Sequence, residues 1–120
     1  MGNMPVGFAL ELDESRPPYT VMALKGEVDV GTVAVVREKL VDLASRGQNQ
    51  LVVDLEGASF LDSVGLSVLV AGLKRARSQG GELALVSTRP VILNVLQVTG
   101  LTRVFPIFGT VDEATRPEAR

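Results

Sequence analysis

The chain has 120 residues, 46% of them hydrophobic, so we expect one domain that buries roughly two-thirds of the surface its unfolded form exposes. Cysteine and histidine are both absent, which excludes disulfide bonds, thiolate chemistry, and histidine as a general base or metal ligand. The aromatic content of 4% and the formal net charge of −2, with no basic run, argue against direct binding of nucleic acid.

The first half of the chain predicts two strands and a helix. Residues Phe8 to Asp13 alternate between apolar and polar, which is the period of a half-buried edge strand, and turn residues follow at 14–18. The apolar run from Tyr19 to Leu24 is typical of a strand covered on both faces, so the two segments predict a hairpin. Apolar residues at three- and four-residue spacing from Val33 to Ala44 predict a helix that stops at Gly47.

The second half predicts alternating strands and helices. Strands are expected at 51–55, 83–86 and 104–108, with a loop at 57–59. Helices are expected from an N-cap at Asp62 or Ser63 to Gly80, from Pro90 to about Val98, and for one or two turns after Thr110. The order β-β-α-β-α-β-α-β-α predicts an α/β fold, with a mostly parallel sheet, an antiparallel N-terminal edge strand and right-handed connections.

The chain shows no sign of a second domain or of a membrane segment. It has no internal repeat and no linker-like change of composition, so we expect one domain over residues 1–120, with an ordered core at about 6–116. No apolar stretch approaches the roughly 20 residues that cross a bilayer, and the N-terminus has no signal-peptide pattern. We therefore expect no membrane insertion and a cytoplasmic location.

The helix after Asp62 has two apolar faces. Leu66, Leu69 and Leu73 share the face that is expected to pack on the sheet, given an advance of ~100° per residue. The opposite face carries Val64, Val68, Ala71 and Arg75. Because an outward helix face is usually charged, these residues indicate either an exposed partner-docking ridge flanked by Ser63 and Ser67, or a face that another helix covers. Singly exposed valines without a role are the third possibility.

Ser63 has three possible roles. As an N-cap or first-turn residue it would satisfy a free amide and contribute ~1 kcal/mol. As a nucleophile it would need a base, and the chain has neither histidine nor the glycine two residues before Ser63 that a nucleophile elbow requires, so no catalytic residue is predicted. As a phosphoacceptor it is well placed, because a helix N-terminus favours the added negative charge.

Asp54 suggests a rival site, the phosphoacceptor aspartate of a receiver-like domain. Such a site needs an acidic pair after the first parallel strand to hold magnesium, and a lysine after a later strand. The only lysines are Lys25, Lys39 and Lys74, and no acidic pair follows an opening parallel strand. Asp54 is therefore interpreted as a turn or capping residue, and neither a metal nor a cofactor is expected.

Five short segments together resemble the STAS-domain family of bacterial anti-sigma factor antagonists. They are LKGEVD at 24–29, VDL at 53–55, SFLDSVGL at 59–66, TGL at 99–101 and FPIF at 105–108. With the final Glu113 and Ala114 the resemblance covers essentially the whole chain, and its most specific part is the Asp-Ser-x-Gly-Leu block that begins at Asp62. Two positions depart from the family pattern, which often has Ser or Thr at Val64 and Gly at Ser67.

The resemblance implies a regulatory switch at Ser63. An anti-sigma factor serine kinase would bind the unphosphorylated protein, which frees a sigma factor, and would phosphorylate Ser63 to end that binding; a serine phosphatase would reset the switch. The residues expected to contact the partner are Asp29, Asp62, Ser63, Val64, Ser67, Val68, Ala71 and Arg75. The alternative is a STAS module that serves, without phosphorylation, as an interaction subunit of a transporter or a stress-sensing complex. Asp29 is expected beside the Asp62-Ser63 turn, either shaping that edge or capping a helix.

Overall fold

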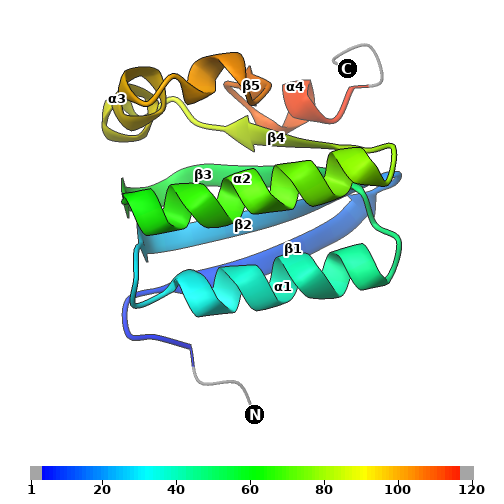
Figure 1. The fold of residues 1–120 in the computed structure, drawn as a ribbon, viewed down its shortest axis with the longest axis horizontal. Coiled ribbons are helices and arrows are strands. Elements are labelled where there is room, and N and C mark those ends of the chain that lie inside the picture. The colour runs from blue at the N-terminus through cyan, green and yellow to red at the C-terminus, as the bar shows by residue number, and fades with distance from the viewer. Residues whose placement is uncertain (1–3, 117–120) are drawn as a thin grey trace.

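Five strands form one sheet in the order β1-β2-β3-β4-β5, with helices between them (Figure 1). The computed structural model describes residues 4–116, and the remainder of the predicted domain, 1–3 and 117–120, lies outside the described residues. The strands are β1 (Ala9–Arg16), β2 (Tyr19–Val28), β3 (Gln50–Leu61), β4 (Glu82–Val86) and β5 (Ile107–Phe108). The helices are α1 (Val33–Ser45), α2 (Ser63–Ser78), α3 (Pro90–Val98), the 3-10 turn η1 (Leu101–Arg103) and α4 (Val111–Ala114).

The strand directions confirm the predicted fold class. β1 runs antiparallel to β2 at the edge of the sheet, and the pairs β2-β3, β3-β4 and β4-β5 are parallel. Each parallel pair is joined through a helix, as a parallel connection requires. The protein is thus an α/β domain with an antiparallel N-terminal edge strand.

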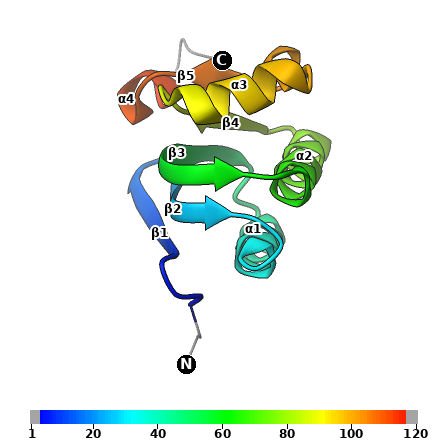
Figure 2. The ribbon, with the colours of Figure 1, turned by 90° about the vertical axis from the view of Figure 1, so that its left-hand side faces the viewer.

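The two faces of the sheet carry hydrophobic cores of unequal size. α1 and α2 lie side by side on one face, and α4 lies on the other (Figure 2). The larger core includes Leu40 of α1, Leu69 of α2 and Ile92 of α3, all of them buried against the strands. The smaller core joins Tyr19 and Val21 of β2 to Val52, Val86 and Ala114. Burial on both faces explains why β2 and β4 read as continuous apolar runs.

The loop predicted at 57–59 is wrong, because these residues continue β3 as far as Leu61. Their pairing with β2 is irregular, with register shifts at Ala23/Lys25 and Gly26/Glu27. A Cβ on Gly57 would lie 3.2 Å from the Leu24 carbonyl oxygen, so glycine here permits a close approach of the two strands. The small residues that suggested a loop therefore mark a bulged part of the sheet.

The last strand is shorter than the predicted 104–108. β5 contains only Ile107 and Phe108, because the helical turn before it extends further. Val104 and Phe105 both donate backbone hydrogen bonds to the Leu101 carbonyl oxygen, each at 3.0 Å. Phe105 is buried in the larger core all the same, so its apolar character reflects packing and not membership of a strand.

Candidate functional site

The turn from β3 into α2 is held by three hydrogen bonds around Asp62. Its Oδ1 accepts from the Gly65 N–H at 2.8 Å, which makes Asp62 the N-cap of α2. Its own N–H donates to the Val28 carbonyl oxygen at 3.1 Å, and its carbonyl accepts from Leu66 N–H at 2.9 Å. Asp62 thus connects the end of β2, the end of β3 and the first turn of α2.

Asp62→Ala should lower the free energy of unfolding by about 1 kcal/mol, because Gly65 N–H loses its cap. Asp62→Asn keeps the side-chain oxygen and loses only the charge near the helix N-terminus, so its cost should be smaller, about 0.5 kcal/mol. Urea unfolding followed by circular dichroism measures both. Equal destabilisation by the two substitutions would show that the carboxylate charge, and not the cap, is what matters.

Ser63 is the first residue of α2, and its side chain is exposed. Within residues 4–116 no hydrogen bond engages its hydroxyl, while its carbonyl oxygen accepts from Ser67 Oγ at 3.0 Å. Since Asp62 is the N-cap, the alternative that Ser63 itself caps the helix is wrong. The hydroxyl is therefore accessible at the positive end of a 16-residue helix.

Asp29 lies at the same edge of the sheet as this turn. Val28 and Leu61 are register partners in the parallel pair β2-β3, so the residues that follow them, Asp29 and Asp62, leave the sheet side by side. Asp29 Oδ1 accepts from Gly31 N–H at 2.9 Å, and its N–H donates to Thr32 Oγ1 at 3.0 Å. Asp29 thus shapes the turn that leads into α1, whose N-cap is Thr32.

The outward face predicted for α2 is partly covered, because α1 lies beside it. Val68 is only 5% exposed and belongs to the larger core, so its prediction as part of an exposed ridge is wrong. Val64 and Arg75 are half-buried, and Ser67 and Ala71 are exposed. The alternative that another helix covers this face is correct for Val68.

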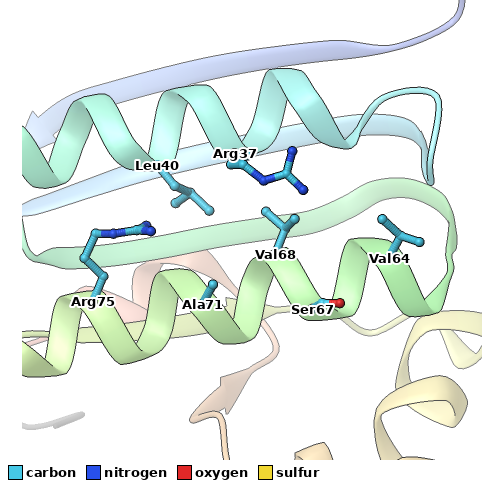
Figure 3. Close-up of a pocket in the computed structure, with 7 residues that line it drawn as sticks. All are labelled: Arg37, Leu40, Val64, Ser67, Val68, Ala71 and Arg75. Atoms are coloured by element: carbon cyan, nitrogen blue, oxygen red, sulfur yellow. The ribbon is translucent and has the colours of Figure 1, made fainter.

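The uncovered part of this face is a groove between the two helices, called here the α1–α2 groove (Figure 3). Its volume is about 180 Å³. α2 contributes Val64, Ser67, Val68, Ala71 and Arg75, all of which were predicted from the sequence. α1 contributes Arg37 and Leu40, which were not. The spacing of Leu40 indicated a buried face of α1, but nothing in the sequence pairs that face with α2.

Two further acidic residues have local structural partners. Asp54 lies within β3, paired with both neighbouring strands, so its interpretation as a turn residue is wrong; its Oδ1 accepts a hydrogen bond from the Glu56 N–H at 2.9 Å, which is a local capping contact inside the strand. Glu56 accepts from Thr88 N–H at 2.6 Å and from Thr88 Oγ1 at 2.7 Å. These bonds, with a smaller effect of Arg89, hold the pKa of the Glu56 carboxyl below its usual value. Because the pKa is lowered, the hydrogen bonds between Thr88 and the ionised Glu56 carboxylate stabilise the fold at neutral pH, and this stabilisation is lost as the pH falls and Glu56 is protonated.

The described residues contain no metal site of the usual kind and no membrane-crossing helix. No three Asp or Glu side chains among residues 4–116 gather closely enough to hold a metal ion. In the same residues, no helix has both the length and the apolar character needed to cross a bilayer.

The fold and the turn define a class, the small α/β domains that present a serine hydroxyl where a parallel strand leads into a helix. The particular family follows from the sequence: the model of the STAS domain family matches residues 11–114, and the chain belongs to that family. The predicted family is therefore confirmed.

Several named relatives are anti-sigma factor antagonists. The anti-sigma-B factor antagonist of Bacillus subtilis (strain 168) is 38% identical over 84 residues, which cover 70% of this chain and 76% of the relative. A solved anti-sigma factor antagonist from Mycobacterium paratuberculosis superimposes with a TM-score of 0.82 at 26% identity and covers 92% of each chain.

SpoIIAA, another anti-sigma factor antagonist, has been solved in two forms. The unphosphorylated form superimposes with a TM-score of 0.76 at 25% identity, over 88% of this chain and 92% of SpoIIAA. The phosphorylated form, from Bacillus, superimposes with a TM-score of 0.71 at 25% identity, over 88% of this chain and 96% of SpoIIAA. One fold thus accommodates both forms of that protein.

Proposed function

We propose that this protein is a non-enzymatic anti-sigma factor antagonist controlled by phosphorylation of Ser63. Its unphosphorylated form binds an anti-sigma factor serine kinase and thereby releases a sigma factor in the cytoplasm. Phosphorylation by that kinase ends the binding, and a serine phosphatase restores it. The observation that carries the proposal is the exposed hydroxyl of Ser63 at the start of α2 in a STAS domain whose named relatives are anti-sigma factor antagonists.

The position of Ser63 supports a modification that leaves the fold intact. A phosphate adds a charge of about −1.5 to −2 at neutral pH, and the N-terminus of α2 favours negative charge. The hydroxyl makes no hydrogen bond within residues 4–116 that the modification would break. The free energy of unfolding should therefore change little.

The effect of the phosphate is expected in the complex. Any partner that covers Ser63 must also cover Asp62 and the half-buried Val64, so a dianion here would be desolvated next to a carboxylate and an apolar side chain. The proposed contact surface consists of Asp29, Asp62, Ser63, Val64, Ser67, Ala71 and Arg75, with Val68 supporting it from below. Like-charge repulsion at this edge would make the complex of the phosphorylated protein at least tenfold weaker than that of the unphosphorylated protein.

The test is to incubate the protein with the anti-sigma factor kinase of its organism and ATP, and to map the product by tandem mass spectrometry. We expect one phosphate, on Ser63, and no modification of Ser63→Ala. In Ser67→Ala, which removes the hydroxyl one helical turn away, the phosphate should still be on Ser63. Calorimetry should give a dissociation constant at least tenfold higher for Ser63→Asp than for Ser63→Ala. Phosphate on Ser67 in place of Ser63, or equal binding of the two variants, would refute the proposed switch.

A further inference from the structure

The α1–α2 groove has an apolar floor. Leu40 of α1 is 2% exposed and Val68 of α2 is 5% exposed, both line the groove, and Ala71 beside them is exposed. At about 180 Å³ the groove is smaller than the roughly 300 Å³ or more that usually encloses a small ligand. A shallow apolar groove between two parallel-lying helices suits the side chains of a polypeptide better than a whole small molecule.

Two arginines extend toward this floor from opposite helices, Arg37 from α1 and Arg75 from α2 (Figure 3). Neither forms an ion pair with any described residue between 4 and 116. The neighbouring arginines behave differently: Arg46 pairs with Asp42 at 3.0 Å, and Arg77 pairs with Glu82 at 2.9 Å. The groove thus carries two uncompensated positive charges on a protein whose net charge is −2.

We propose that the α1–α2 groove docks an acidic amphipathic segment of the anti-sigma factor partner, an inference that rests on the proposed function. Apolar side chains of the segment pack on exposed Ala71 and half-buried Val64, above the buried Leu40 and Val68. Its carboxylates pair with Arg37 on one side and Arg75 on the other. The planar guanidinium group suits such carboxylates, because it can donate two parallel hydrogen bonds to each. A helix with apolar and acidic residues on adjacent stripes has the required pattern.

The groove also connects the partner to the switch. Val64 lines the groove and directly follows Ser63 in α2, so a phosphate on Ser63 stands close to the end of the groove. Its negative charge opposes an acidic segment through space, in addition to the desolvation cost at the turn itself. Phosphorylation then weakens two contacts of the partner with one group.

Charge reversal in the groove tests the inference, with the kinase that phosphorylates Ser63 as the binding probe. Arg37→Glu combined with Arg75→Glu should raise the dissociation constant of the unphosphorylated protein at least tenfold. Lys74→Glu is the control, since it makes the same change of charge as each single arginine substitution, at an exposed residue of α2 that does not line the groove. It should change the dissociation constant less than threefold, and added salt should weaken the wild-type complex more than that of the double variant.

A crosslinking experiment identifies the segment. A photo-crosslinking amino acid at exposed Ala71 should capture a peptide of the kinase that contains several Asp or Glu residues, as read by mass spectrometry. The same group at exposed Thr102 in η1, outside the groove, should capture none. Capture of a basic or neutral segment at Ala71 would overturn the inference.

The outcomes separate the two proposals. Wild-type binding by the double arginine variant, combined with weak binding by Ser63→Asp, overturns the groove and leaves the switch in place. If the unmodified wild-type protein binds no anti-sigma factor kinase, both proposals fail. Circular dichroism checks that the double variant is folded, and Arg37→Gln with Arg75→Gln, which removes the charges without reversing them, should give an intermediate loss of binding.

Discussion

Val68→Asp is expected to lower the free energy of unfolding by about 3 kcal/mol or more. Val68 is 5% exposed and belongs to the larger core, on the side of α2 that faces α1. An aspartate there is desolvated whether it is ionised beside the arginines of the groove or protonated, and in both cases the apolar contacts of the valine are lost. Urea unfolding at neutral pH measures the effect, which should become smaller as the pH falls toward the carboxyl pKa.

Ala71→Asp is the matched control for this substitution. Ala71 lies on the same helix three residues later, lines the same groove and is exposed, so its variant should differ from the wild type by no more than ~0.5 kcal/mol. If Val68→Asp does not fold, Val68→Thr can be compared with the wild type in its place. It keeps the shape of the side chain and adds a buried hydroxyl, so its free energy of unfolding should be lower by about 1–2 kcal/mol. Similar stability of the Val68 and Ala71 variants would mean that α1 does not cover Val68.

Gly65→Ala is expected to cost about 1–3 kcal/mol, although alanine normally favours a helix. A Cβ at this position would lie 2.9 Å from the Val28 carbonyl oxygen and 2.9 Å from Leu61 Cδ1. The Val28 carbonyl cannot move freely, because it also accepts the hydrogen bond from the Asp62 N–H. The added methyl group therefore pushes the first turn of α2 away from the sheet and displaces Ser63 with it.

Gly72→Ala provides the comparison within the same helix. A Cβ there would lie 3.0 Å from Leu40 Cδ1 and 3.2 Å from Leu83 Cδ1, and leucine methyl groups can shift more easily than a backbone carbonyl. The gain in helix propensity of ~1 kcal/mol should then offset most of the crowding. Denaturant unfolding of both variants, with phosphorylation of Gly65→Ala by the kinase as a second measurement, tests this. Equal costs would indicate that the backbone contact at Val28 is unimportant.

Local features of the sequence predicted most of the elements, because their causes are local. The apolar spacing of α1 and α2, the proline at the start of α3 and the small residues after helices depend on residues within one or two turns. The predictions at 57–59 and 104–108 were wrong because the residues there were selected by contacts with segments distant in the sequence. Gly57 is small because β2 approaches it closely, and Phe105 is apolar because it packs into the core.

The α/β class, the buried face of α2 and the position of Ser63 in its first turn could be predicted from the residues alone. These follow from periodicity and from the capping preference of Asp62, which act along the chain. That α1 covers Val68, and that Arg37 and Leu40 join Arg75 in one groove, is visible only in the folded protein. A helix sequence shows which of its faces is apolar, but the choice of neighbour depends on how the crossovers place the two helices on the sheet, and no residue pattern within either helix records it.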